Sequence, residues 1–181
     1  MTSLLSGERM NANDLQCVVK CDPVLSQYIV GIYAADEMPR NIETFPCGFI
    51  VNTDPKQKPG QHWLAVYLPN QHTGEFFDSF GHPPKYYPYN FSNFFDEKGL
   101  TVYYNNKRLQ TNMSRVCGHY CIFYLFNRCR GRKMESIVRF FSDNYFNNDE
   151  FVCSYVTNMF PYCLQHSGKC QSVCMSDKII H

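Results

Sequence analysis

The chain has 181 residues, of which 44% are hydrophobic and 18% are charged, so it can bury one substantial core as a single domain spanning residues 1–181. This composition excludes an intrinsically disordered chain, and the formal net charge of +1 gives no electrostatic indication of a nucleic-acid or membrane partner. No segment approaches the roughly 20 apolar residues of a membrane-spanning helix, which argues against a membrane protein.

The first third of the chain predicts one helix followed by the first strands of a sheet. Residues 11–20, NANDLQCVVK, have the apolar spacing of a short helix, with Asn11 or Asn13 as its N-cap. The apolar segment Tyr28–Tyr33 ends at an acidic turn, and Phe49–Asn52 reads as a strand before a loop rich in turn-forming residues.

The middle of the chain predicts a hairpin. His62–Leu68 and Glu75–Ser79 are strands, and PNQHTG between them has the composition of a hairpin loop. The prolines of Gly81–Tyr89 prevent a further strand there, whereas β-branched and aromatic Thr101–Tyr104 predicts a third strand of the same sheet.

The pattern then becomes helical. Cys117–Arg128, CGHYCIFYLFNR, is apolar almost all the way round, which indicates a buried central helix with Ser114 as its cap and Gly131 just after its end. Two further helices are expected at Met134–Phe141 and Glu150–Phe160. The predicted fold class is therefore α+β, with a central mixed sheet packed against this helix and flanking helices at both ends.

Four polar residues stand where these elements would bring them together. His62 opens one strand and Asp78 ends its hairpin partner, so the two lie side by side in an antiparallel pair. Cys117 begins the central helix, and Gln110 lies seven residues before it in the loop leading in. A helix N-terminus and a neighbouring imidazolium lower the pKa of a thiol, which makes it a nucleophile.

Each of the four has a role in acyl transfer. His62 would act as the general base, Asp78 would orient its ring, and the Gln110 amide with the Cys117 backbone N–H would bind the oxyanion. Taken singly, a buried cysteine at a helix start is more often core packing, and a histidine at a strand start is commonly structural. Only the combination favours a catalytic site.

Two segments resemble the adenoviral endopeptidases, or adenains. GFIVNTDPKQKPGQHWLAVYLPNQHTGEFFDSFG has their strand, His-Trp pair and aromatic-acidic motif ending in Phe-Gly, and QTNMSRVCGHYCIFYLF has a Gln seven residues before a Cys-Gly that opens a helix. Weaker similarity extends this resemblance over most of residues 15–163. The same His–Asp–Gln–Cys order occurs in the wider clan of ubiquitin-like-protein (SUMO) proteases.

The resemblance implies a papain-like fold and a cysteine endopeptidase with Cys117 as nucleophile, His62 as base, Asp78 as orienting acid and Gln110 as oxyanion donor. Trp63 resembles the tryptophan that covers the substrate channel and favours glycine beside the cleaved bond. Adenains usually carry Glu as the third residue, so Asp78 is closer to the ubiquitin-like-protein proteases.

The expected function is cleavage of viral capsid and core precursor proteins at glycine-containing sites through a thioester acyl-enzyme. Because the N-terminal residues lack the basic and apolar regions of a signal peptide, we expect the host nucleus or cytoplasm and the virion as its location, not secretion. The ten cysteines should then be mostly reduced. No membrane partner is expected.

The chemistry itself requires no cofactor and no metal. The resemblance implies a peptide activator, which adenains bind through a disulfide, and a DNA activator. Here no cysteine lies between Cys47 and Cys117, and Gly99 stands near the position of the linking cysteine, so a disulfide-linked peptide is not expected. The near-neutral charge leaves a nucleic-acid activator without electrostatic support.

Two further groups of polar residues stand outside the four-residue site, one basic and one rich in cysteine and histidine. The basic cluster that follows the central helix, Arg128 to Lys133, is interpreted as compensation of the helix dipole rather than a nucleic-acid site. Cysteine and histidine near the C-terminus suit zinc, but their spacing is not that of a standard finger; they are Cys163, His166, Cys170 and Cys174. The polar residues 167–181 are expected to form a flexible tail.

Other functions remain open from the residues alone. The nearest enzyme alternative is a deubiquitinase or deSUMOylase with the same four residues, and one of another class is a catalytically inactive module that binds ubiquitin-like tails. A chymotrypsin-like cysteine protease would need an all-β pattern, and a structural capsid protein would not need the four residues.

Overall fold

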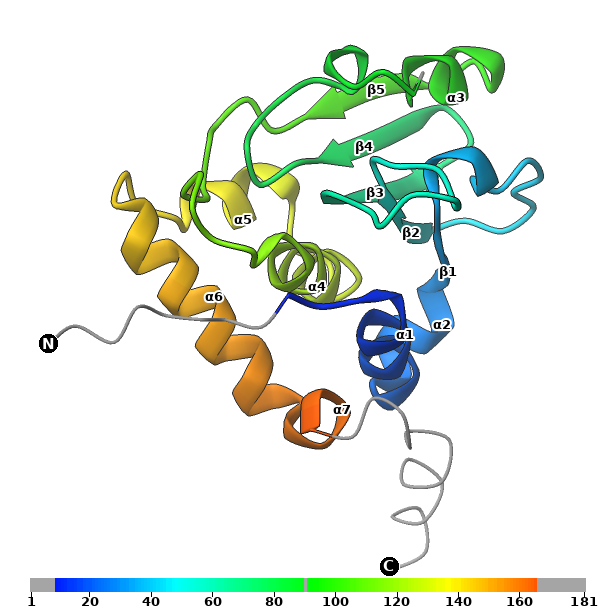
Figure 1. Ribbon diagram of the computed structural model, residues 1–181. Helices are drawn as coiled ribbons and strands as arrows, with labels where there is room; N and C mark the ends of the chain where they lie inside the picture. The colour runs from blue at the N-terminus through cyan, green and yellow to red at the C-terminus, as the bar shows by residue number, and fades with distance from the viewer. Residues whose placement is uncertain (1–8, 90, 166–181) are drawn as a thin grey trace, which may run out of the picture.

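The computed structural model describes residues 9–89 and 91–165, which form an α+β fold around one five-stranded mixed sheet (Figure 1). The strand order follows the sequence: β1 (Ile29–Tyr33), β2 (Cys47–Asn52), β3 (Trp63–Asn70), β4 (Thr73–Phe77) and β5 (Thr101–Tyr104). The three central strands are antiparallel to one another, and each outer strand is parallel to its neighbour. Within the described residues, no helix is long and apolar enough to cross a membrane.

Both faces of the sheet are buried, and side-chain alternation divides the core into two layers. On β3, Leu64 and Val66 belong to one hydrophobic cluster, whereas Ala65 and Tyr67 belong to the other. This explains why the β3 sequence is apolar throughout rather than alternating with polar residues.

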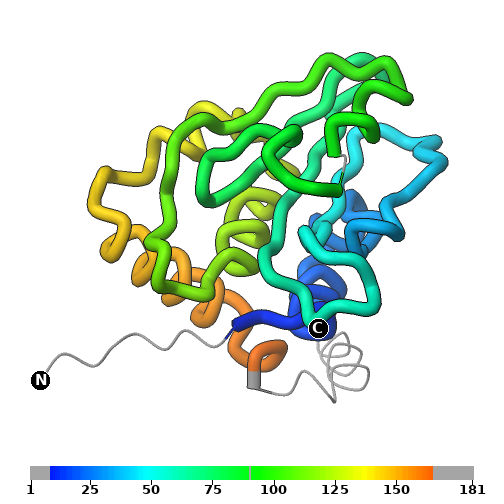
Figure 2. Tube along the Cα trace, turned by 45° about the horizontal axis from the view of Figure 1, so that its top comes forward, coloured from blue at the N-terminus to red at the C-terminus, as the bar shows by residue number. Residues whose placement is uncertain are grey.

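Helices cover the two faces unequally (Figures 1 and 2). The larger group surrounds α4 (Cys117–Arg128), which packs directly on β3 and against α6 (Tyr145–Met159), while α3 (Phe91–Glu97) lies on the opposite side of the sheet beside β5. The helices are α1 (Ala12–Cys21), α2 (Pro23–Tyr28), α3 (Phe91–Glu97), α4 (Cys117–Arg128), α5 (Met134–Arg139), α6 (Tyr145–Met159) and α7 (Pro161–Gln165).

The ends of the two most strongly predicted helices show why their bounds were readable. Asn11 caps α1 by accepting hydrogen bonds from Asn13 N and Asp14 N, and the Asp14 side chain accepts in turn from Asn11 N at 2.8 Å. The helix α4 has the predicted bounds, and Gly131 has the expected positive φ of 87°. The prediction that Ser114 caps α4 is wrong.

The predicted sheet strands are all present, with one residue or two of difference at their ends, but three short helices were not predicted. α2 begins with Pro23, α3 with Phe91 and α7 with Pro161, and each spans less than two turns, too short for a clear apolar period. α6 starts at Tyr145, before the predicted Glu150, because Asn144 caps it by accepting from Asn147 N.

Two of the four basic residues in the cluster at the end of α4 form ion pairs. Arg128 binds Glu75 through two nitrogens at 2.8 and 3.0 Å, and Arg130 binds Asp22 at 2.6 Å. Both guanidinium groups also stack on aromatic rings. This arrangement agrees with a structural interpretation of the cluster.

Candidate active site

The central hairpin places a histidine and a carboxylate side by side. His62 directly precedes β3 and Asp78 directly follows β4, and the register pairs Ala65 with Phe77 near this end of the hairpin. The backbone of His62 is fixed from the other side, because Thr53 N–H donates to its carbonyl oxygen at 2.9 Å. The predicted juxtaposition of His62 and Asp78 is thus present in the fold.

The histidine ring lies between the carboxylate and a thiol. His62 Nε2 is 2.7 Å from Asp78 Oδ1, and the ring also hydrogen-bonds with the side chain of Cys117, the first residue of α4. Since Nε2 faces Asp78, Nδ1 is the nitrogen that serves Cys117. All three side chains are buried: the exposed fraction is 8% for His62, 0% for Asp78 and 4% for Cys117.

The electrostatics of this trio favour a charged pair. Burial on its own lowers the pKa of His62, but hydrogen bonds and charges from Asp78 and Cys117 outweigh it and raise the pKa to about 9. Burial on its own raises the pKa of Cys117, but His62 and the backbone N–H groups of Trp63 and Gly118 outweigh it and lower the pKa. These two shifts both favour the thiolate–imidazolium form of the pair.

The lowered pKa of Cys117 sets it apart from five other cysteines of the chain. Burial raises the pKa of each of these, and for Cys121, directly inside the core, it does so strongly. The group comprises Cys47, Cys121, Cys129, Cys153 and Cys163.

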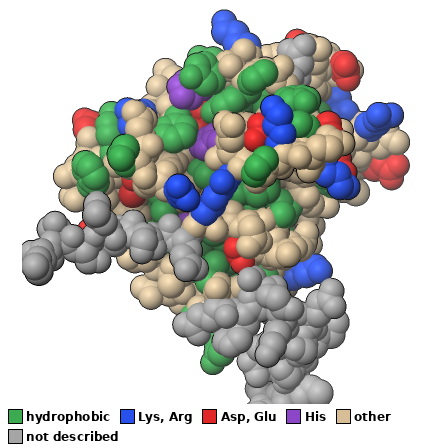
Figure 3. Space-filling model, in the orientation of Figure 1, with side chains coloured by type: hydrophobic (Ala, Val, Ile, Leu, Met, Phe, Trp, Pro, Cys, Tyr) green, Lys and Arg blue, Asp and Glu red, His purple; other side chains and the backbone are tan. Residues whose placement is uncertain are grey.

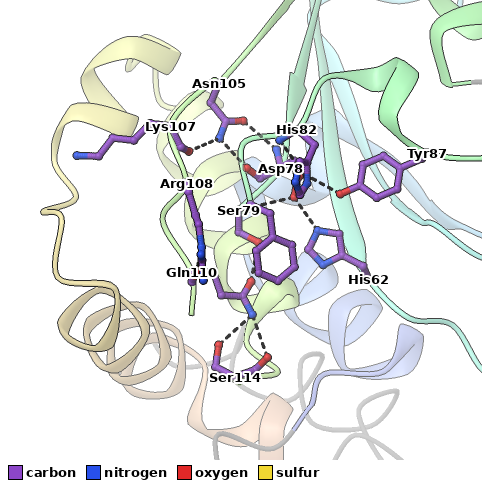
Figure 4. Close-up of polar contacts among 11 residues, drawn as sticks. His62, Asp78, Ser79, His82, Tyr87, Asn105, Lys107, Arg108, Gln110 and Ser114 are labelled. Carbon is purple, nitrogen blue, oxygen red and sulfur yellow. Dashed lines mark hydrogen bonds and ion pairs between the residues drawn. The ribbon is translucent and has the colours of Figure 1, made fainter. Parts of the chain in front are cut away.

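Asp78 sits in a cradle of hydrogen-bond donors that keeps it ionised (Figure 4). Its Oδ1 accepts from His62 and, at 2.9 Å, from Phe80 N, whereas Oδ2 accepts from His82 N at 3.0 Å, His82 Nδ1 at 3.1 Å and Tyr87 Oη at 2.7 Å. Burial on its own raises the pKa of Asp78, but these bonds and the charge of His62 outweigh it and lower the pKa. The carboxylate is thereby oriented from both of its oxygens.

The backbone of Asp78 is held separately by Asn105. Asp78 N donates to Asn105 Oδ1 at 2.9 Å, and Asn105 Nδ2 returns a bond to Asp78 O at 2.6 Å. Aromatic rings pack around the histidines: His62 stacks on Phe80 at 4.8 Å and His82 on Tyr86 at 3.8 Å. Sequence patterns did not indicate these supporting residues, because they lie in loops without periodicity.

Gln110 reaches the same region by way of the loop before α4. Its backbone N–H and that of Leu109 both donate to Ser79 O, and its side chain accepts from Ser79 Oγ at 2.6 Å (Figure 4). Its amide nitrogen donates to Ser114 O at 3.2 Å and Ser114 Oγ at 3.0 Å. Ser114 is thus engaged with Gln110, which explains why it does not cap α4.

Asp149 on α6 anchors the loop before α4 through hydrogen bonds to its side chain. Its Oδ2 accepts from Thr111 N and Thr111 Oγ1, and its Oδ1 accepts from Tyr120 Oη at 2.9 Å. Tyr120, on α4, also donates to Leu109 O at 3.0 Å. The buried carboxylate therefore ties together α4, α6 and the loop that carries Gln110.

Trp63, the residue after the histidine, is buried and packs at the start of α4. Its indole Nε1 donates to Met10 O at 2.9 Å. A Cβ at Gly118 would lie 3.0 Å from Met10 Cβ and 3.4 Å from Trp63 Cδ1, so glycine is the residue that fits between them. This packing brings the segment before α1 against the candidate site.

Two hollows adjoin the His62 segment. One of about 610 Å³ is lined by His62, Phe80, Tyr87 and Arg108, and the other, of about 380 Å³, is lined by Trp63 and the loop that follows β2. In Figure 3, histidine side chains reach the surface among hydrophobic ones, while Lys and Arg side chains are scattered over this face. The described part of that face therefore carries no continuous basic patch.

Of the five residues proposed from sequence, the fold brings Asp78 and Cys117 each into contact with His62. Trp63 lies next to them and Gln110 in the adjoining loop. The C-terminal zinc suggestion lies mostly outside the described residues, since only Cys163 of its four members is included. The flexible tail predicted at 167–181 also lies outside them.

The sequence is similar to adenovirus proteases. It is 29% identical over 89 residues to the protease of bovine adenovirus 7, covering 42% of this chain and 44% of that protein. It is 31% identical over 97 residues to the protease of bovine adenovirus 4, covering 46% and 48% respectively. The chain thus matches less than half the length of these relatives, and no protein-family model matches it.

A solved structure shares the fold. The central domain of the uncharacterized Lpg1148 protein from Legionella pneumophila superposes with a TM-score of 0.50 at 11% identity, covering 87% of this chain and 99% of that one. At this identity, the likeness concerns the arrangement of the chain alone.

Proposed function

We propose that the chain is a cysteine endopeptidase of the adenain type that cleaves virion precursor proteins at glycine-containing sites. The observation that carries this proposal is the His62 ring, which hydrogen-bonds Asp78 on one side and Cys117 on the other. The similarity to two adenovirus proteases supports the viral context.

In the proposed acylation the nucleophile is the Cys117 thiolate, which the neighbouring His62 imidazolium favours. Cys117 Sγ attacks the carbonyl carbon of the substrate, and the electron pair of the C=O bond moves to oxygen. When this tetrahedral species collapses, the C–N bond breaks and the leaving amine takes the proton from His62 Nδ1. A thioester to Cys117 remains.

Deacylation reverses the roles. Neutral His62 removes a proton from water as the water attacks the thioester, and the C–S bond breaks to release the carboxylic acid and restore the thiolate. Asp78 keeps the ring oriented and stabilises the imidazolium in both halves of the cycle without itself becoming protonated.

The oxyanion would be bound by two N–H groups. The backbone N–H of Cys117 lies in the first turn of α4, where helical N–H groups have no acceptor within the helix. The second donor is Gln110 Nε2, which must exchange a bond to Ser114 for one to the oxyanion. Substrate binding therefore includes a local rearrangement of this amide.

Substrate would lie across His62 and fill the two hollows on either side of it. Trp63 lines the smaller hollow, and the proposed preference for glycine next to the cleaved bond is assigned to this bulky side chain. No disulfide-linked activator is proposed, because exposed Gly99 at the end of α3 offers no thiol. A peptide held by non-covalent contacts remains the form of activator compatible with this chain.

The test uses a fluorogenic Leu-x-Gly-Gly peptide and variants of two cysteines. Cys117→Ala should abolish cleavage while the far-UV circular dichroism and thermal melt remain those of the wild type. Cys153→Ser, at a half-buried thiol on α6, is the matched control and should keep full activity. Full activity of the Cys117→Ala protein would exclude the proposal.

A second panel separates the proposed substrate from its nearest alternative. Asp78 in place of the glutamate usual in adenains favours a test of ubiquitin and SUMO fusions beside capsid precursor peptides. Preference for the precursor peptides is expected. Preferential cleavage of the fusions would instead assign the chain to the ubiquitin-like-protein proteases.

A further inference from the structure

An arginine without a carboxylate partner lines the larger of the two hollows beside His62. Arg108 is half-buried and lies in the loop before α4, next to Gln110 in Figure 4. Its Nε donates to Gln110 O at 2.8 Å, and its guanidinium carbon lies 4.7 Å from the centre of the Tyr145 ring. These contacts orient the side chain and leave Nη1 and Nη2 with no hydrogen bond or ion pair to any described residue.

The arginines at the end of α4 are bound differently. Arg128 is paired with the carboxylate of Glu75. Arg130 is paired with that of Asp22. Taking a cation out of water costs free energy unless an anion pairs with it, and a guanidinium matches the planar shape of a carboxylate. The uncommitted nitrogens of Arg108 in the wall of a hollow are therefore suited to a carboxylate that arrives with a ligand.

Trp63 indicates which half of a substrate enters the larger hollow, provided that the proposed function holds. In that function Trp63 lies beside the acyl half of the substrate, and it lines the smaller hollow but not the larger one. His62, which lines the larger hollow, delivers its proton to the leaving amine. The larger hollow therefore receives the residues that follow the cleaved bond.

The charges of the larger hollow are unequally placed. Asp54 lines both hollows, so it lies where they adjoin, whereas Arg108 lines the larger one alone. The rings of Phe80, Tyr86 and Tyr87 line the same hollow. An acidic side chain that enters it is attracted toward Arg108 and repelled from the boundary at Asp54.

We propose that Arg108 is a specificity-determining residue that binds an acidic side chain within the first few residues after the cleaved bond. Nη1 and Nη2 would donate to the two carboxylate oxygens while Nε stays on Gln110 O. The bound acid would then also be joined, through Arg108, to the loop that carries the proposed oxyanion donor.

The test uses internally quenched peptides that extend across the cleaved bond, with Glu, Gln or Lys at each of the first few positions after it. For the wild-type chain, kcat/KM should be about tenfold higher with Glu than with Gln at one of these positions, and lowest with Lys. Arg108→Gln should abolish the difference between Glu and Gln, and Arg108→Glu should reverse the order in favour of Lys. The matched control Arg115→Gln, which removes the same charge from an exposed residue of the same loop, should keep the wild-type order.

A purely structural role for Arg108 predicts a different result. Loss of its bond to Gln110 O alone would lower kcat/KM equally for all peptides and leave the ratio of Glu to Gln unchanged. Equal cleavage of the Glu and Gln peptides by the wild-type chain, or an unchanged ratio in the Arg108→Gln protein, would overturn the inference. Failure of the proposed function is a separate result, because it appears as full activity of the Cys117→Ala protein on every peptide.

A binding measurement on the wild-type chain covers variants that do not fold and peptides that are not cleaved. In isothermal titration calorimetry, a peptide equivalent to the leaving half should bind about tenfold more tightly with Glu than with Gln at the selected position. High salt should reduce this difference, because it screens a pair that is partly exposed. Equal affinities for the two peptides, or no binding of either, would overturn the inference.

Discussion

Replacing Asp78 by asparagine is the sharpest test of the proposed catalytic arrangement. The substitution keeps the size of the side chain but removes its charge and turns one of its two accepting oxygens into a donor. Asp78 now accepts five hydrogen bonds, two at Oδ1 and three at Oδ2. The amide oxygen of asparagine can accept either the bonds now made to Oδ1 or those made to Oδ2. The amide nitrogen must then face the other set of donors.

The loss of activity can be bounded from these contacts. A hydrogen bond to a charged group contributes about 1.5–3 kcal/mol, and losing one in the transition state lowers the rate by about tenfold to about 150-fold. If the amide nitrogen turns toward His62, it donates to Nε2 and leaves the proton on Nδ1, the wrong tautomer for a base toward Cys117. In that case the loss approaches about 10⁴-fold.

The same substitution shifts the pH dependence in a direction that can be worked out. Asp78 helps to raise the pKa of His62 to about 9, so its loss lowers that pKa, and a less populated imidazolium lets the pKa of Cys117 rise. Activity requires the thiolate and the imidazolium together, so the acid limb of the pH–rate profile should move up and the alkaline limb down. The bell-shaped pH–rate profile therefore becomes narrower, and its maximum rate falls.

Two assays measure this. The value of kcat/KM on the peptide should fall by about tenfold to about 10⁴-fold, and the rate of Cys117 alkylation by iodoacetamide at pH 6 should fall with it. The control is Asp143→Asn, whose exposed side chain pairs with Lys107 at 3.2 Å and should change neither value by more than about twofold. An unchanged alkylation profile in the Asp78→Asn protein would refute the role given to this carboxylate.

Three further predictions concern the surrounding chain. Gly81→Ala should lower the free energy of unfolding in urea by about 1–3 kcal/mol, because Gly81 has φ of 76° and its Cβ would lie 2.8 Å from the Lys107 backbone; an unchanged midpoint would contradict this. Gln110→Ala should lower kcat by about 100-fold to about 1000-fold and leave the alkylation rate of Cys117 intact, whereas an unaltered kcat would remove Gln110 from the oxyanion site. Asp149→Asn should reduce both the melting temperature and kcat, with a stability loss of about 1.5–3 kcal/mol, since this carboxylate accepts three bonds of 2.8 to 3.2 Å; a change in neither would show that it does not hold the loop.

The sequence predicts the parts of the fold that follow from strong local patterns. The hairpin between His62 and Asp78 was readable because two apolar strands flank a short polar turn, and antiparallel pairing then requires their ends to meet. The helix that begins at Cys117 was readable because its residues are apolar on every side. These two patterns alone bring the three central residues together.

Long-range contacts were beyond the reach of the same patterns. The bonds from Asn105 to Asp78 and from Asp149 to Thr111 join residues 27 and 38 positions apart. Each involves a single polar residue with no periodic neighbours. The parallel pairing of β1 with β2 and of β5 with β4 was likewise not predictable. No tight turn joins either outer strand to its partner in the sheet.

The cradle around Asp78 has an evolutionary consequence. Three of its donor residues, Phe80, His82 and Tyr87, lie two, four and nine positions after the carboxylate, so the acid and the groups that hold it are inherited as one short stretch. The glutamate usual in adenains is longer by one methylene, so its carboxylate oxygens would lie too far from the backbone to accept from all of these donors. Relatives that carry Glu at this position should therefore also differ in the stretch behind it, and the single substitution Asp78→Glu should lower the activity of this chain.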